Sequence, residues 1–168
     1  MPFYANEDIM HNLSHALRIL KAARMLVQDY RDKVDLDLVV WGSYFHGMVN
    51  DQRAEIEGFL KSLNLSEQKI RLIVGVSWQS LKEEVPEMLE GKIVHDAHLI
   101  EGGKTFMIVK SLVTGSLRKQ TLDETMEYLE NNVIGKFHCY LPRSKKIYAE
   151  KEKFTRHFLT QLKEDLAV

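Results

Sequence analysis

Leu38 to Asp51 reads LVVWGSYFHGMVND, an apolar run that ends in a histidine, a glycine and, four residues later, an acid. Apolar residues fill most of its first turns, which predicts a helix over Leu36–Val49 that is buried on most of its faces. His46 lies near the C-terminal end of this helix. A buried histidine is either a packing residue whose ring nitrogens are satisfied or a group that the helix presents to a site.

The composition predicts one soluble domain that spans residues 1–168. A chain of 168 residues is long enough for one sizeable core and too short for two. The net charge of −1 disfavours a nucleic-acid partner. The single cysteine, Cys139, excludes an intrachain disulfide and a thiolate zinc cage. Because the sequence has no signal-peptide pattern and no run of roughly 18 apolar residues, we expect a cytoplasmic protein without a membrane segment.

Apolar residues spaced by three and four positions, together with few prolines, predict a chain made of helices. Ser66 and the sequence TLDE at 121–124 are typical helix caps. A Thr-Gly-Ser sequence at 114–116 predicts a turn, and no hairpin signal is present. The fold class that we predict is all-α. Besides the helix over Leu36–Val49, we expect helices from Asn6 or Asp8 to about Tyr30, over 51–63, over 66–78, over 83–99 with Pro86 near its start, and over 104–112, 121–133 and 144–166.

Three short motifs carry histidines and acids. His15 lies in HALRI, His46 lies in WGSYFHG, and Asp96 lies in VHDAHLIE. Together they resemble the HD-domain superfamily of metal-dependent phosphohydrolases, in its small single-domain branch. That family's pattern is a first histidine in H-x-x-R-V/I, a His-Asp doublet that ends the next long helix, and a later D-A-D-x-L-D/E. The resemblance implies an HD-type helical bundle and covers most of the chain, from about residue 11 to residue 158.

Two alignments to that pattern are open, because the chain also contains a His-Asp pair at His95 and Asp96. Taking this pair as the doublet makes His46 the first histidine and places the last acid beyond Asp123. Starting from His15 instead gives gaps of 31 residues to His46 and 50 residues from His46 to Asp96. We prefer the second alignment because the family's usual order is a short gap followed by a long one.

The preferred alignment implies a divalent ion held by His15, His46 and Asp96. In the family, imidazoles and carboxylates hold an ion that polarises a phosphoryl oxygen and lowers the pKa of a bound water. Gly47 stands where the family has the aspartate of its doublet, so one carboxylate ligand is missing. Two histidines and one carboxylate suit Fe²⁺, Mn²⁺, Ni²⁺ or Zn²⁺, and the family's carboxylates also tolerate Mg²⁺. We expect weaker binding than in the complete set.

Asp51, His98 and Arg18 are the residues that we predict to be catalytic. Asp51 comes soon after the doublet position and could supply the missing acid. His98, at the second acidic position of the later motif, could donate a proton to a leaving group. Arg18 matches the arginine of the first motif and either braces the core or contacts substrate. Glu101 either ligates the ion or supports a ligand.

The resemblance implies hydrolysis of a phosphoester or phosphoanhydride in a small phosphorylated compound, nucleotides included. The glycine at position 47 keeps a second hypothesis open, in which the chain is catalytically impaired and binds a nucleotide, an anion or a protein partner. A third hypothesis treats the histidines as packing residues of a plain helical scaffold. Metal uptake separates the third hypothesis from the other two, and turnover separates the first from the second.

Overall fold

A computed structural model describes residues 2–4 and 12–167, and these residues form helices without a strand. The predicted all-α class is therefore confirmed. Short 3-10 helices span Pro2–Tyr4 and Arg31–Lys33. The start predicted for the first helix, at Asn6 or Asp8, lies outside the described residues. The α-helices in the described ranges are α1 (Leu13–Val27), α2 (Leu36–Phe45), α3 (Arg53–Ser62), α4 (Glu67–Gln79), α5 (Leu89–Ile100), α6 (Phe106–Leu117), α7 (Leu122–Asn132) and α8 (Pro142–Leu166).

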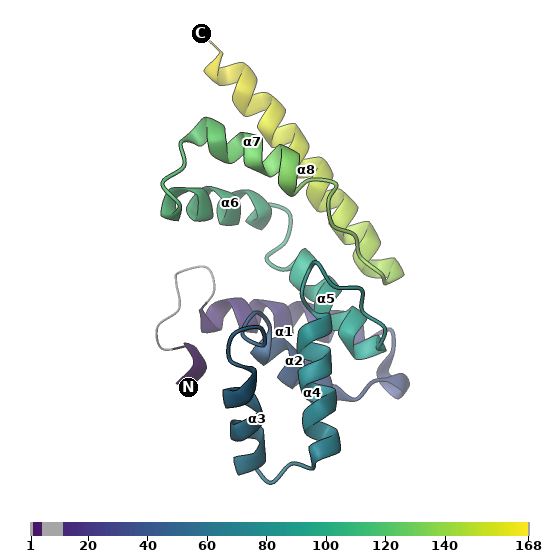
Figure 1. Cartoon of the computed structure of the whole chain (residues 1–168). Coiled ribbons are helices and arrows are strands. Elements are labelled where there is room, and N and C mark those ends of the chain that lie inside the picture. The colour runs from purple at the N-terminus through teal and green to yellow at the C-terminus, as the bar shows by residue number, and fades with distance from the viewer. Residues whose placement is uncertain (1, 5–11, 168) are drawn as a thin grey trace.

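Helix α5 is the central element of the fold, because it packs against α1, α2, α4 and α8 (Figure 1). Helices α1 to α5 form one group, and α6, α7 and the C-terminal part of α8 form a second group beside it. None of the helices in the described ranges is long and apolar enough to cross a membrane. The fully buried residues between α1, α2, α4 and α5 include Ile19, Leu26, Val39, Phe45, Ile73, Val76, Ile93 and Val94.

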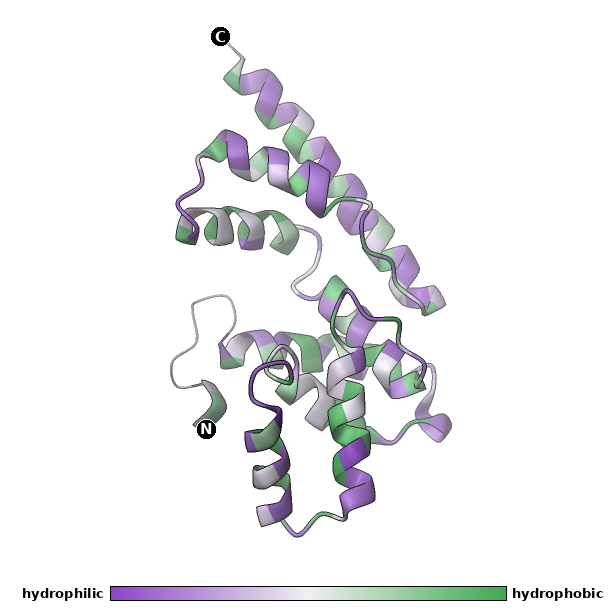
Figure 2. Cartoon of the chain, in the orientation of Figure 1, coloured by the Kyte–Doolittle hydropathy of each residue, from purple (hydrophilic) through white to green (hydrophobic). Residues whose placement is uncertain are grey.

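Within the second group of helices, α6 and α8 differ in their hydropathy. Figure 2 shows that α8 is largely hydrophilic, whereas α6 is largely apolar or neutral. Helix α6 packs against α7 and α8, and residues along it also line a cavity that faces α1 and the end of α5. The apolar character of α6 therefore serves both a packing contact and a cavity wall.

The predicted caps begin the helices as expected. The Ser66 hydroxyl accepts a hydrogen bond from the backbone N–H of Lys69, at 3.2 Å, and so begins α4. Thr121 and Glu124 form a reciprocal capping box at the start of α7. Because each cap satisfies backbone donors that the first turn leaves open, these two helix starts could be predicted from local sequence.

Several predicted boundaries are wrong, two of them for reasons that the structure makes plain. Helix α5 begins at Leu89, so Pro86 lies in the preceding loop and not near a helix start. Helix α6 continues to Leu117 through the turn predicted at 114–116. Gly115 explains the second error, because a Cβ added there would lie 2.2 Å from Oγ1 of Thr125 on α7. The glycine permits the close approach of two helices and does not end one.

Two buried polar side chains join α5 to α8, one from each helix. Asp96 is completely buried on α5 and accepts hydrogen bonds from the backbone N–H groups of Tyr140, at 2.9 Å, and Leu141, at 2.7 Å. The hydroxyl of Ser144 also donates to this carboxylate. Since Leu141 makes no side-chain cap of its own, Asp96 caps α8 from a neighbouring helix.

Lys151 makes the reciprocal contact from α8. Its buried ammonium group donates to the carbonyl of Leu99, at 3.0 Å, and to that of Glu101, at 2.7 Å. These carbonyls belong to the last turn of α5, where a helix leaves acceptors without internal partners. The two contacts together fix the C-terminal half of α5, which carries residues of the candidate site.

Replacing Asp96 with alanine should lower the free energy of unfolding by about 3 kcal/mol, because the N–H groups of Tyr140 and Leu141 lose a charged acceptor. Urea denaturation followed by circular dichroism measures the change. The matched control is Asp32→Ala, which removes an exposed carboxylate and should change the value by less than about 0.5 kcal/mol. Equal effects of the two substitutions would contradict the capping role.

Candidate metal centre

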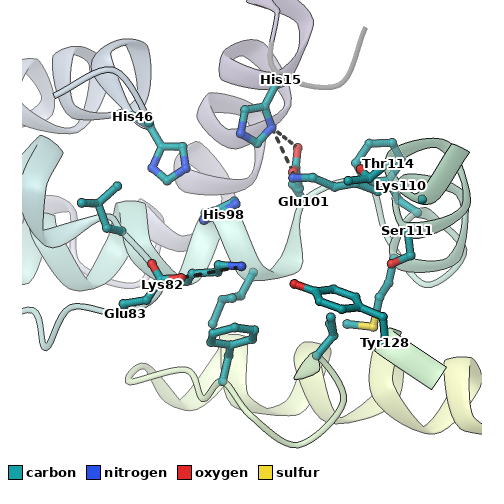
Figure 3. A pocket seen from close by; sticks show the side chains of 18 of the residues that line it. His15, His46, Lys82, Glu83, His98, Glu101, Lys110, Ser111, Thr114 and Tyr128 are labelled. Atoms are coloured by element: carbon teal, nitrogen blue, oxygen red, sulfur yellow. Dashed lines mark hydrogen bonds and ion pairs between the residues drawn. The ribbon is translucent and has the colours of Figure 1, made fainter. Parts of the chain in front are cut away.

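Three histidines from three helices converge at one wall of a cavity (Figure 3). His15 comes from the first turn of α1, His46 from the residue that follows α2, and His98 from the last turn of α5. One potential ligand atom of each residue lies within 4.8 Å of those of the other two. The ring centroids are 5.5 Å apart for His15 and His46, 5.4 Å for His15 and His98, and 4.1 Å for His46 and His98.

Burial keeps two of these rings neutral. It lowers the pKa of His46 to about 3, and the neighbouring His15 and Lys110 act in the same direction when charged. Burial also lowers the pKa of His98 well below its ordinary value. Neutral imidazole is the form that binds a metal ion, so neither ring has to lose a proton at neutral pH before it can bind one.

Hydrogen bonds at Nδ1 fix the orientation of the His15 and His46 rings. The carboxylate of Glu101 accepts from Nδ1 of His15 at 3.0 Å. The hydroxyl of Ser80 donates to the carbonyl of Ser77, so its oxygen accepts from Nδ1 of His46, at 2.7 Å. Both contacts assign the proton to Nδ1 and the lone pair to Nε2. Such supporting acceptors fix the tautomer and orientation of histidines that bind metal ions.

The third ring carries the observation that most directly indicates a ligand. Nδ1 of His98 is buried and has no hydrogen-bond partner among residues 2–4 and 12–167. Buried polar atoms are nearly always satisfied, so an orphaned nitrogen beside two oriented imidazoles calls for a bound group. Three imidazoles with further positions open are a ligand set that suits a catalytic transition-metal ion. The residues present therefore fit a divalent ion.

Glu101 supports the cluster from behind. Its carboxylate is almost fully buried and accepts from Nδ1 of His15, from Nε of Arg18 at 3.2 Å and from Nζ of Lys110 at 2.8 Å. Burial alone would raise the pKa of Glu101, but the hydrogen bond from His15 and the charge of Lys110 outweigh it and lower the pKa to about 2. The carboxylate is thus ionised and already surrounded by donors.

Arg18 does not line the cavity, although we predicted it to be catalytic. Its guanidinium group lies over the ring of Phe106, 4.6 Å from the centroid, and holds the carboxylate of Glu101. This geometry corresponds to the bracing role that was the alternative for Arg18. Asp51, also predicted to be catalytic, is an exposed residue on the cavity wall and lies outside the ligand group formed by the described residues.

The structure does not bring Asp96 to the imidazoles of His15 and His46. Successive residues of a helix advance by about 100°, so residues 96 and 98 point in nearly opposite directions. Asp96 faces α8, where its carboxylate acts as a cap, and His98 faces the cavity. The geometry argues against the ligand role predicted for Asp96. It also moves His98, which we predicted as a proton donor, into the ligand cluster.

The cavity beside the cluster has a volume of about 480 Å³. Its wall carries several cationic side chains, among them Lys82, Lys110 and Arg118. Lys82 lies over the ring of Phe137, with 4.7 Å between Nζ and the ring centroid, and Arg118 lies over the ring of Tyr128 at 5.8 Å. The cavity thus combines positive charge with aromatic surface next to the imidazoles.

The backbone explains the glycine at position 47. Helix α2 ends at Phe45, earlier than predicted, and the N–H of Met48 donates to the carbonyl of Phe45 at 3.1 Å. His46, with φ −54° and ψ 131°, and Gly47, with φ +79°, are the central residues of a type II turn. That turn requires a positive φ at its third residue, which favours glycine. A Cβ at Gly47 would meet nothing within 4 Å, so backbone conformation and not space disfavours a side chain.

Gly47→Ala should lower the free energy of unfolding by about 1 kcal/mol, because alanine is strained at a positive φ. Gly58→Ala is the matched control, since this glycine lies inside α3 and a Cβ there also meets nothing within 4 Å. The control should raise the free energy of unfolding by roughly 0.5–1 kcal/mol. Thermal or urea denaturation compares the two, and a change of the same sign in both would refute the turn geometry.

The low pKa of Glu101 predicts a dependence of stability on pH in the metal-free protein. A carboxylate whose folded-state pKa is depressed stabilises the fold above its unfolded pKa, and this contribution disappears as the pH falls through the folded value. The window therefore runs from about 4.5 down to about 2. Glu101→Gln should flatten the loss of unfolding free energy across this window, whereas the exposed Glu127→Gln should leave it unchanged. Urea denaturation across the window tests this, and identical slopes for the two variants would count against an ionised Glu101.

Solved structures with the same architecture include a named HD-superfamily hydrolase. Bacillus subtilis YpgQ, solved in complex with ADP, superposes with a TM-score of 0.75 at 15% identity, over 93% of this chain and 90% of that chain. The Lin1889 protein from Listeria innocua gives a TM-score of 0.74 at 20% identity, over 93% and 88% of the two chains. An HD-superfamily hydrolase from Bacillus thuringiensis gives 0.73 at 14% identity, over 94% and 88%.

These likenesses establish the fold. No family model matches the sequence, and comparison with curated proteins gives no significant match. The correspondence of Gly47 to the doublet's aspartate stays a prediction. The chain has the helical fold of HD-superfamily hydrolases, which confirms the resemblance predicted from its three short motifs.

Proposed function

We propose that this protein is a cytosolic metal-dependent phosphohydrolase whose divalent ion is held by His15, His46 and His98. The observation that carries the proposal is the convergence of three imidazoles, with ligand atoms within 4.8 Å of one another, at the wall of a cavity of about 480 Å³. Cavities of roughly 300–1,000 Å³ are typical of sites for small molecules. The fold, shared with a named HD-superfamily hydrolase, supports hydrolysis as the reaction class.

A divalent ion, when bound, supplies Lewis acidity, which polarises a phosphoryl oxygen and lowers the pKa of a water molecule to near 7. The protein's own residues supply position. Glu101 and Ser80 hold the rings of His15 and His46 through Nδ1, and the α5 backbone holds His98. Two of the rings come from packed helices and the third from the hydrogen-bonded turn that ends α2, so their arrangement rests on regular backbone structure.

The cationic wall of the cavity supports a phosphorylated substrate. Lys82, Lys110 and Arg118 line the same cavity as the imidazoles, and ammonium and guanidinium groups donate charge-assisted hydrogen bonds to phosphate oxygens. The ring of Tyr128 adds an apolar surface to the wall (Figure 3). The structure of YpgQ with ADP supports a compound of nucleotide size as the substrate class.

A second candidate function is a binding protein that keeps the cavity without turnover. The observation that favours it is Gly47, which provides no carboxylate where the motif resemblance places one. Such a protein would still take up an ion and a phosphorylated ligand. Hydrolysis therefore distinguishes the two functions, and metal binding alone does not.

The metal-loaded protein should hydrolyse generic phosphoesters or nucleotides. Loss of a residue that only supports a metal ligand lowers activity by roughly 10–100-fold, so His46→Ala, which removes a ligand, should reduce kcat/KM by at least as much. His157→Ala is the matched control, because this histidine is exposed on α8. Phosphate release after loading with Zn²⁺, Co²⁺, Ni²⁺ or Mn²⁺ measures the rates.

Turnover that survives in His46→Ala would contradict the proposed centre. Ion binding by the unmodified protein without phosphate release from any phosphoester would instead favour the binding protein. Circular dichroism of each variant separates a lost ligand from a lost fold.

A further inference from the structure

The ligand cluster differs in charge from the set that the motif resemblance implies. The pattern has acids at positions 47 and 98, where this chain has Gly47 and His98, and the acid at position 96 contacts the start of α8. The ligand group therefore consists of His15, His46 and His98, and its side chains carry no formal negative charge when the rings are neutral. Any ion that binds there must be held by nitrogen donors.

The nearest carboxylate is committed to other partners. Glu101 accepts hydrogen bonds from Nδ1 of His15, Nε of Arg18 and Nζ of Lys110, at 3.0, 3.2 and 2.8 Å. Moving it onto an ion would break contacts to two half-buried cations and would release the ring of His15. Its negative charge is also largely compensated by Arg18 and Lys110, so little of it remains to attract an ion.

Divalent ions respond differently to such a site. Mg²⁺ and Mn²⁺ are bound mainly by carboxylate, carbonyl and water oxygens, whereas imidazole suits Zn²⁺, Ni²⁺ and related ions. We propose that this cluster of three imidazoles selects a zinc-type ion, namely Zn²⁺, Co²⁺ or Ni²⁺, and discriminates against Mg²⁺ and Mn²⁺, with His98 as the residue that sets this preference. The proposal rests on the metal centre of the proposed function and specifies the ion it uses.

The surroundings of the cluster add to the discrimination. Lys110 and Lys82 line the same cavity and neutralise the carboxylates beside them, Glu101 at 2.8 Å and Glu83 at 3.7 Å, so these pairs present no net negative charge to the rings (Figure 3). Ions that depend on charge attraction for their binding lose affinity where no net negative charge faces them, while ions that form strong bonds to nitrogen are affected less. Ser80 and Glu101 in turn orient the two rings that they contact for nitrogen coordination.

The experiment measures dissociation constants for Zn²⁺ and Mn²⁺, by competition with a chromophoric chelator, in the unmodified protein, in His98→Asp and in His157→Asp. Zinc binds more tightly than manganese at nearly every protein site, so the ratio in one protein decides little. The change in the ratio is the informative quantity. His98→Asp replaces a nitrogen ligand by a carboxylate and should shift the ratio of the two dissociation constants in favour of manganese by at least about tenfold. Loss of a residue that only supports a metal ligand already changes metal affinity by that much. His157→Asp, on the exposed face of α8, should leave it unchanged.

A ratio that stays the same in His98→Asp, or one that moves equally in the control, would overturn the proposal. The absorption spectrum of the unmodified protein with Co²⁺ gives a readout that needs no variant. A site with few ligands, most of them nitrogen, gives intense visible bands, and the pale spectrum of a six-coordinate, oxygen-rich ion would overturn the proposal as well.

These outcomes are separate from failure of the proposed function. Absence of binding of every ion tested would remove both the metal centre and the selectivity. Zinc binding with the predicted shift in His98→Asp, but without phosphate release, would leave the selectivity standing and remove the hydrolase. Hydrolysis supported equally by Mg²⁺, Mn²⁺ and Zn²⁺ would leave the hydrolase and remove the selectivity.

Discussion

The contact between the Asp96 carboxylate and the N-terminus of α8 organises the half of the molecule that carries the candidate site. A buried charge is costly unless hydrogen-bond donors surround it, and here two backbone N–H groups and a serine hydroxyl do so. Lys151 returns the contact from α8 to the end of α5. Both contacts come from α8 and the residues just before it, and they fix the last turns of α5, which present His98 to the cavity and lead directly into Glu101.

The electrostatics of the site depend on a contrast between neutral rings and one ionised acid. Burial keeps His46 and His98 uncharged near neutral pH, since a charged imidazole would lose its hydration there. Glu101 stays ionised in spite of burial because His15, Arg18 and Lys110 donate to it. In our proposal, imidazole nitrogens beside a carboxylate that is already paired produce a site that favours nitrogen-binding ions.

Local signals in the sequence were sufficient for the fold class, most helix positions and two of the three clustered histidines. His15 and His46 lie in motifs whose resemblance to the HD-domain pattern implies a shared site, and the caps at Ser66 and Thr121 act within a few residues. The choice between Asp96 and His98 could not be made in this way. Both lie in one short motif, but two residues of separation turn them to opposite faces of α5, and the motif does not say which face meets His46.

Long-range contacts account for the other differences between sequence and structure. The motif resemblance leaves open whether Glu101 ligates the ion or supports a ligand, and only its contact with His15, 86 residues away in the chain, favours the supporting role. Gly115 resembles a turn residue until α7 is packed against it, and Gly47 marks the end of α2 only once the type II turn is seen. In each case the residue is explained by a neighbour or a backbone angle that tertiary structure supplies.

Anomalous scattering from crystals grown with Zn²⁺ tests the proposed metal centre most directly, since it locates the ion without reference to activity. Our account predicts one strong peak between the imidazoles of His15, His46 and His98, with the carboxylate of Asp96 still hydrogen-bonded to the start of α8. A peak at the Asp96 carboxylate, or crystals with zinc in the medium and no peak at the three imidazoles, would contradict it.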